Sequence, residues 1–219
     1  MKKKLFIVLI LLILTFFSLY FKPAETATIN KNINVLVLLP KYYGANTMLV
    51  LDDMEEFGWE VKTCGIEKNI TACSWAGGVG LPTLSVDLLV PEVTDITQYD
   101  VLVLANASWR SHTTDIWNDV MLDETAMNLI KTAVNNNIVV YAPCSAPRVL
   151  AAAGLLNGVK ITGVDQYANE FTAAGANYVG PNILPVIDKN IVTSTRGMYY
   201  HYEICEAIST ALEQLKKNN

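Results

Sequence analysis

The fold of this chain is decided by the stretch Val139-Val140-Tyr141-Ala142-Pro143-Cys144-Ser145-Ala146-Pro147. The apolar run at residues 138–141 is typical of a buried parallel strand, and residues 148–156 follow with helical spacing. Two small residues after the cysteine allow a tight turn, and Pro147 suits the first helical turn, where its missing N–H costs nothing. The pattern predicts a sharp strand-to-helix turn with Cys144 at its tip.

The rest of the chain alternates short apolar runs with helical patterns, which is typical of a parallel sheet covered by helices on both faces. We expect strands at residues 33–39, 59–63, 86–90, 101–105 and 138–141, and helices at 47–57, 126–134, 148–156 and 204–215. Residues 178–179, 184–187 and 191–195 should be short extended pieces, the last two joined by a hairpin turn at Asp188-Lys189-Asn190. The fold class predicted is α/β with a mainly parallel sheet.

Size and composition predict one domain. The chain has 219 residues, 52% of them hydrophobic, which is enough for one sizeable core. Its net charge is -5, and residues 1–28 hold four lysines and one glutamate, so the remainder carries −8. No cluster of lysine and arginine follows Lys22, and binding to phosphates needs such a cluster. The composition therefore argues against a nucleic-acid partner.

The N-terminus has the composition of an export signal. Three lysines, residues 2–4, precede an uncharged apolar run from Leu5 to Phe21. The run is longer than the ~7–15 residues of a usual signal core and shorter than the ~20 that span a bilayer, so a cleaved signal and a membrane anchor both remain open. We expect residues 1–28 to be that signal or anchor, 29–32 a short linker, and 33–217 a domain outside the cytoplasm, secreted or held by one N-terminal segment.

Four cysteines in an exported chain permit disulfide bonds. Cys64 and Cys73 flank a polar stretch expected to be a loop, so a bridge between them is one hypothesis. Cys205 lies in a helical pattern and is expected to be a buried small hydrophobe. Cys144 is then the cysteine left for chemistry.

Cys144 is a candidate nucleophile for two physical reasons. A residue at the tip of a buried parallel strand lies at the carboxyl edge of the sheet, where open α/β folds bind ligands. The start of the following helix presents unpaired N–H groups and a partial positive charge, which favour a thiolate. A buried and inert cysteine is the alternative interpretation.

Further segments occur in a recognisable order around this turn: Tyr99-Asp100-Val101-Leu102-Val103-Leu104, then Ala151-Ala152-Ala153-Gly154-Leu155-Leu156, Ala174-Gly175-Ala176-Asn177-Tyr178-Val179, and Asp188-Lys189-Asn190-Ile191-Val192-Thr193-Ser194. Together they resemble the DJ-1/PfpI family over roughly residues 33–215. The resemblance implies a flavodoxin-like three-layer sandwich, related to class I glutamine amidotransferases, with the turn cysteine as reactive centre. Family members include peptidases, amidases, glyoxalase-like and deglycase-like enzymes, chaperones and redox sensors, so the fold transfers better than the activity.

The chain departs from the family pattern at three places. Members usually carry a glutamate early in the first helix, hydrogen-bonded to the cysteine, and Asn46 stands at that position here. Peptidase-like members follow the cysteine with histidine and glycine, whereas this chain has Ser145 and Ala146. The paired glycines that help to form an oxyanion hole are replaced by Asn106-Ala107-Ser108. We therefore take Asn46, Asn106 and Ser145 as candidate substrate-binding residues.

A general base would have to come from one of two histidines. His201 opens the last helical pattern, and its His-x-Glu spacing to Glu203 is similar to the His-Pro-Glu of glutamine amidotransferases, so Cys144, His201 and Glu203 could form a catalytic set. His112 follows another strand end and could reach the same rim. A solvated surface histidine is the alternative at both positions.

Two functional interpretations follow. The first is an exported cysteine-dependent hydrolase, amidase or glyoxalase-like enzyme that acts on a small carbonyl, amide or peptide substrate. The second is a non-catalytic family member that binds a ligand, senses redox state or acts as a chaperone after losing the acid partner of its cysteine. We expect no cofactor or metal, because the histidines are not spaced as ligands and no Cys/His cluster occurs. The resemblance also implies a homodimer.

Overall fold

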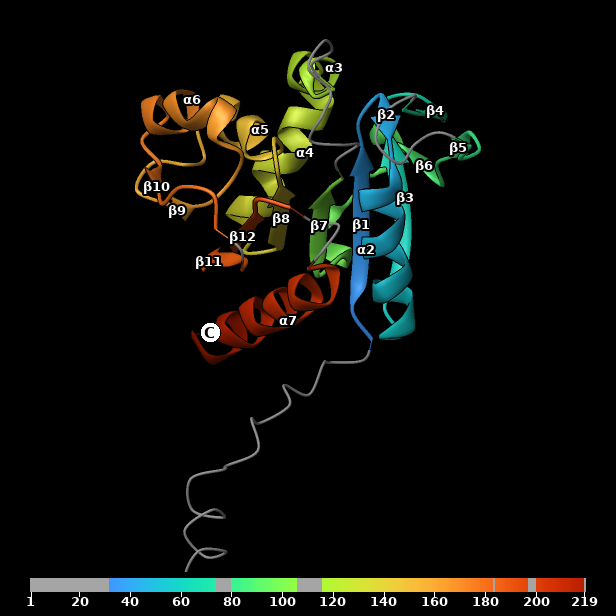
Figure 1. Cartoon of the computed structure of the whole chain (residues 1–219). Coiled ribbons are helices and arrows are strands. Elements are labelled where there is room, and N and C mark those ends of the chain that lie inside the picture. Colours follow the sequence, from blue (N-terminus) through green and yellow to red (C-terminus); the bar gives the residue numbers. More distant parts are fainter. Residues whose placement is uncertain (1–31, 74–79, 106–115, 183, 197–199, 219) are drawn as a thin grey trace, which may run out of the picture.

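Figure 1 shows the computed structural model of the chain, which describes residues 32–73, 80–105, 116–182, 184–196 and 200–218. The predicted N-terminal signal or anchor lies outside these residues. Within the described ranges, no helix combines the length and the apolar character needed to cross a bilayer. Export of the domain stays a prediction.

A seven-stranded sheet forms the centre of the molecule, in the order β11-β12-β8-β7-β1-β3-β6 (Figure 1). The strand bounds are β1 (Asn34–Leu39), β3 (Glu60–Gly65), β6 (Leu88–Leu89), β7 (Val101–Leu104), β8 (Val139–Pro143), β11 (Val186–Asp188) and β12 (Ile191–Ser194). Every neighbouring pair is parallel except β11 and β12, which are antiparallel. The predicted α/β class with a mainly parallel sheet is confirmed.

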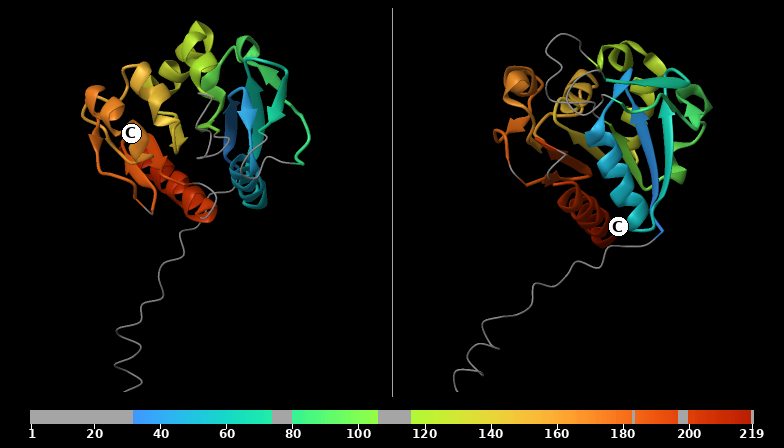
Figure 2. Two further views of the ribbon diagram at one scale, coloured as in Figure 1. Left: turned by 45° about the horizontal axis from the view of Figure 1, so that its top comes forward. Right: turned by 45° about the vertical axis from the view of Figure 1, so that its right-hand side comes forward.

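Each strand divides its side chains between two hydrophobic cores, because successive residues of a strand point to opposite faces. In β1, Val35 and Val37 pack with residues of α2 (Ala45–Glu56) and α7 (His201–Asn218). Leu36 and Leu38 pack on the other face, with residues of α3 (Asn118–Leu122), α4 (Glu124–Asn135) and α5 (Pro147–Ala152). Figures 1 and 2 show α2 and α7 side by side on their face of the sheet. The three-layer sandwich is confirmed.

The predicted helices and the hairpin are present with small changes of bounds. α5 ends at Ala152, before the predicted residue 156, because Gly154 turns the chain with a φ of +74°. Strand β6 is shorter than predicted, because Val90 already begins a 3-10 turn (Val90–Glu92) that contains a proline. In the hairpin, Asp188 pairs with Ile191 and Lys189 takes the left-handed conformation that a tight turn needs.

Several small elements were not predicted, except that β10 (Asn177–Tyr178) overlaps the extended piece predicted at residues 178–179. A second sheet joins β2 (Tyr42–Tyr43), β4 (Asn69–Ala72) and β5 (Leu84–Ser85), and a third joins β9 (Lys160–Ile161) and β10 (Asn177–Tyr178). Short 3-10 turns lie at Ile96–Gln98 and Asp165–Tyr167, and the latter leads into α6 (Ala168–Ala173). These elements are only two to six residues long, so their pattern in the sequence is too short to identify them.

The structure contains no disulfide bond between Cys64 and Cys73, so the predicted bridge is not formed. The stretch between them is not a loop but contains β4, and both side chains are fully buried members of one hydrophobic core. Burial raises the pKa of the Cys64 thiol to about 12. The two cysteines therefore act as small apolar side chains in the core, and Cys205 is likewise fully buried, as predicted.

Replacing Asn190 by alanine should lower the free energy of unfolding by about 2–3 kcal/mol. The buried amide of Asn190 donates hydrogen bonds to the carbonyls of Val134 (2.9 Å) and Ile138 (2.8 Å), which join the end of α4 to the start of β12. Urea unfolding measures the change. Asn136→Ala is the matched control, because its amide also bonds a carbonyl at the end of α4 but is exposed. An equal loss in both variants would contradict a special role for the buried amide.

Candidate active site

Cys144 occupies the predicted strand-to-helix turn, between the end of β8 at Pro143 and the start of α5 at Pro147. Its φ is +58°, in the left-handed region that residues with a β-carbon rarely adopt. Such a conformation costs about 1–3 kcal/mol and persists only where surrounding contacts impose it. A cysteine held in this way on a strand-to-helix turn is the geometry of a nucleophile elbow.

Two backbone hydrogen bonds hold the elbow. The N–H of Cys144 donates to the carbonyl of Ser194 at the end of β12 (2.7 Å), and its own carbonyl accepts from the N–H of Val164 (3.2 Å). Gly163 allows this approach, because a β-carbon there would lie 3.1 Å from the Cys144 oxygen and 3.0 Å from the Phe171 ring. Both backbone groups of the strained residue are therefore fixed by segments distant in the sequence.

Cys144 lines a narrow cavity at the carboxyl ends of β1, β7 and β8, beneath α2. The chain passes from β1 to β3 and β6 on one side and returns to β7 on the other, so the sheet reverses its winding between β1 and β7. Open α/β folds bind ligands at such a reversal. The closed part of the cavity has room for about one water molecule, so it suits a small reacting group.

The cavity is mostly apolar and is lined by a few polar groups. Its apolar wall consists of Val37, Val50, Leu51, Val103, Ala105 and Pro143. Asn46 and Thr47, from the first turn of α2, lie in the same cavity as Cys144. Among the described residues that line it, none is a carboxylate or an imidazole. The structure thus brings Asn46 to the cysteine, as the resemblance implied, and its role in substrate binding stays a prediction.

Tyr141 also lines the cavity, although no feature of its sequence context distinguishes it. Its hydroxyl shares a buried 2.8 Å hydrogen bond with the hydroxyl of Ser194, so it joins β8 to β12 beside the elbow. Burial raises the pKa of Tyr141 far above its usual value. The phenol is therefore neutral and does not supply a base.

His201 has a different partner from the predicted one. Its Nδ1 pairs with a carboxylate oxygen of Asp53 on α2, rather than with Glu203. Neither His201 nor Glu203 is among the described residues that line the cavity of Cys144. The structure therefore does not assemble these three residues in that cavity, and the catalytic set stays a prediction. Nothing in the sequence marks Asp53 as the partner of His201, because the two residues are 148 positions apart and Asp53 lies in an ordinary helical pattern.

The remaining candidates divide into two groups. Ser145 follows the elbow, and its carbonyl accepts a hydrogen bond from the N–H of Arg148 (3.1 Å), which closes the turn into α5. Asn106 and His112 lie outside the described residues, so their predicted roles are untested.

The order of stability of two variants tests the strain at the elbow. Cys144→Gly should unfold with a free energy about 0.5–1 kcal/mol higher than Cys144→Ala, because glycine tolerates the left-handed backbone and alanine does not. At the neighbouring Ser145, which is not left-handed, the order of the glycine and alanine variants should reverse. Thermal or urea unfolding of the four variants gives both orders. The same order at both positions would argue against a strained Cys144.

Comparison with known proteins places this geometry in a family. The model of the DJ-1/PfpI family matches residues 33–211. The uncharacterized protein MJ0967 of Methanocaldococcus jannaschii is 35% identical over 106 residues, which are 48% of this chain and 47% of that protein, so the match spans about half of each.

Solved structures agree in fold. The ThiJ/PfpI domain protein of Brachyspira murdochii has a TM-score of 0.67 at 18% identity, over 84% of this chain and 99% of that one. Oxidized DJ-1 of Toxoplasma gondii has a TM-score of 0.66 at 20% identity, over 84% and 95%. A two-domain protein of Anabaena variabilis, with DJ-1/ThiJ/PfpI-like and ferritin-like domains, has a TM-score of 0.66 at 20% identity, and the match covers 85% of this chain but only 48% of that one. From the family match and the shared fold, we conclude that the chain belongs to the DJ-1/PfpI family.

Proposed function

We propose that Cys144 is the reactive nucleophile of this protein and that it acts on the carbonyl carbon of a small substrate, an aldehyde or ketone, an amide or a short peptide. The observation that carries the proposal is the left-handed backbone of Cys144 at the strand-to-helix turn, beside a cavity at the reversal of the sheet. Backbone strain of this kind persists only where the surrounding structure offsets its cost, and it is found mainly at active sites and ligand-binding sites.

Each group in the cavity has a separate role in the proposed reaction. The thiolate of Cys144 adds to the carbonyl carbon, the C=O π bond opens, and the negative charge moves from the sulfur to the carbonyl oxygen. The amide of Asn46, in the same cavity, can donate a hydrogen bond to that oxygen. The apolar wall lowers the local dielectric constant, so this hydrogen bond would be stronger than in solution. The small volume favours substrates with a short group on the reacting carbon.

A second candidate function is ligand binding without turnover. It is favoured by Asn46, because an amide can stabilise an oxyanion but cannot take up or release a proton at neutral pH. The pairing of His201 with Asp53 points the same way, because it gives that imidazole a partner outside the cavity lining. In this case a covalent adduct would form on Cys144 and persist.

Incubation of the native full-length protein with a panel of small aldehydes, α-oxoaldehydes, amides and esters tests the proposal. Intact mass and product analysis should show a covalent adduct or turnover with at least one carbonyl class, and Cys144→Ser should abolish both. Asn46→Ala should slow adduct formation on the order of 10²-fold, as expected for loss of an oxyanion donor.

Cys205→Ser is the matched control for this experiment. Burial and the nearby Asp53 raise the pKa of the Cys205 thiol, so this variant should behave as the native protein does. Turnover indicates the enzyme, and a persistent stoichiometric adduct indicates the binding protein. If adducts form equally well in Cys144→Ser, or with no member of the panel, the proposed role of Cys144 is wrong.

A further inference from the structure

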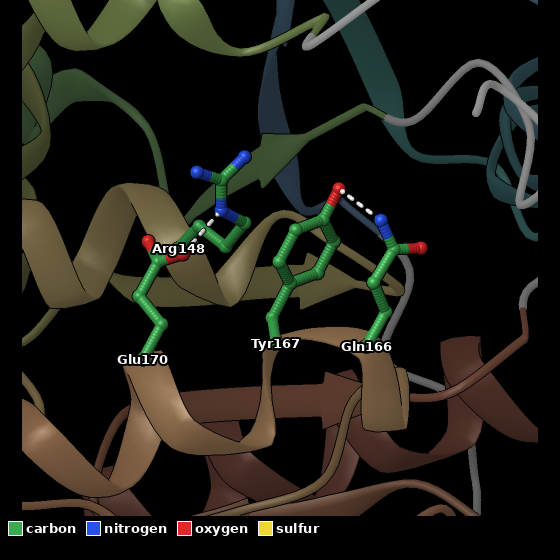
Figure 3. Close-up of polar contacts among 4 residues, drawn as sticks. All are labelled: Arg148, Gln166, Tyr167 and Glu170. Carbon is green, nitrogen blue, oxygen red and sulfur yellow. Dashed lines mark hydrogen bonds and ion pairs between the residues drawn. The ribbon is translucent and has the colours of Figure 1, made fainter. Parts of the chain in front are cut away.

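Arg148 lies in the first turn of α5, four residues after Cys144. Its side chain contacts Tyr167, just before α6, and Glu170, within α6 (Figure 3). Its Nε donates a hydrogen bond to a carboxylate oxygen of Glu170 at 2.7 Å, and its guanidinium carbon lies 4.3 Å from the centre of the Tyr167 ring. The Arg148 side chain is only 15% exposed. One planar group thus makes a charged hydrogen bond and a stacking contact at once.

The segment that Arg148 holds also touches the elbow directly. The Val164 N–H donates to the Cys144 carbonyl, and Gly163 lies so close to that carbonyl that a β-carbon would not fit without movement. The residues from 163 to 170 therefore meet the Cys144 turn twice, once through the backbone at Val164 and once through Arg148.

The opposite edge of this segment is anchored independently. The Tyr178 hydroxyl, from β10, donates to the Gly163 carbonyl (3.0 Å) and lies 2.9 Å from a carboxylate oxygen of Asp165. Figure 3 shows Gln166 beside Tyr167, with its amide 3.4 Å from the Tyr167 hydroxyl. With Tyr178 holding one edge, Arg148 supplies the contact on the side of α5, the helix that begins at the elbow.

A lysine could not replace Arg148 in this arrangement. An ammonium group is a point charge without a planar face, so it could pair with Glu170 but could not also stack on Tyr167 with the same geometry. The observed contacts therefore depend on the shape of the guanidinium as well as on its charge.

We infer that Arg148 is a positioning residue for Cys144. It fixes the segment 163–170 against α5, so that the Val164 N–H holds the Cys144 carbonyl and keeps the sulfur-bearing residue in its left-handed conformation. This inference rests on the proposed function for the reactivity of Cys144. The contacts of Arg148 with Glu170 and Tyr167, which we call the clamp, can be tested separately through hydrogen exchange at Val164.

The test compares Arg148→Met and Arg148→Lys with the native protein. Lys160→Met is the matched control, because this variant removes an exposed positive charge on the nearby β9 without changing the contacts of Arg148. Two quantities are measured: the rate of Cys144 alkylation by iodoacetamide as a function of pH, and the hydrogen exchange of the Val164 amide. Both Arg148 variants should lower the alkylation rate at neutral pH about tenfold and speed exchange at Val164 by a similar factor. Lys160→Met should change neither.

Several outcomes would overturn the inference. The first is a native rate of hydrogen exchange at Val164 in Arg148→Met. The second is full recovery of both quantities in Arg148→Lys, which would leave charge as the only cause. The third is a lower melting temperature with an unchanged pH–rate profile, which would indicate a merely structural role. If Arg148→Met does not fold, Glu170→Gln and Tyr167→Leu remove one contact each and should produce smaller changes in the same direction. A native Cys144 that reacts like an ordinary thiol would refute the proposed function, while exchange at Val164 would still decide whether the clamp exists.

Discussion

The left-handed backbone of Cys144 is the constraint on which the rest of the site depends. A residue with a β-carbon adopts this conformation at a cost of about 1–3 kcal/mol. Two backbone hydrogen bonds, to Ser194 and from Val164, contribute about 0.5–1.5 kcal/mol each and can offset that cost. The donor and acceptor come from segments 20 and 50 residues further along the chain, so the elbow depends on tertiary contacts with the segments around Val164 and Ser194.

The residues of the cavity beside the elbow leave one chemical question, which is whether an adduct on Cys144 turns over or persists. Cys144 and Asn46 lie together at the reversal of the sheet, where a nucleophile and a hydrogen-bond donor could act on the same carbonyl group. The two candidate functions share this first step and differ only in the proton transfers that follow. In the proposed reaction, an amide at position 46 would assist the first step but could not supply the later proton transfers. The family fold by itself does not decide between enzyme and binding protein.

The elements with strong local patterns could be predicted from the sequence. The apolar run before Cys144, the Pro147 after it and the hairpin turn around Lys189 each contain their own signal, and all three are present. The position of Asn46 was found through the family pattern rather than through periodicity. The central sheet, the cysteine elbow and the approach of α2 to the cavity were therefore accessible before the structure was known.

The contacts between distant segments could not be predicted. Asp53 and His201, Arg148 and Glu170, and Tyr141 and Ser194 are pairs that only the tertiary fold defines. The Cys64–Cys73 bridge was wrong for a related reason: short spacing around a polar stretch resembles a loop, but β4 there carries the chain into the core and buries both thiols separately. Small strands of two to four residues are set by their neighbours, and no periodicity can be read over so short a length.

The most direct test of this account is the rate of Cys144 alkylation at neutral pH in the native protein, divided by the rate for the same cysteine in the urea-unfolded chain. Peptide mapping separates Cys144, which is itself only 3% exposed, from the other three cysteines, whose side chains are fully buried. If Cys144 is the nucleophile that we propose, its ratio should lie above one, whereas the ratios for Cys64, Cys73 and Cys205 should lie far below one. A ratio below one at Cys144 as well would show an inert buried thiol and would contradict its proposed role as a nucleophile.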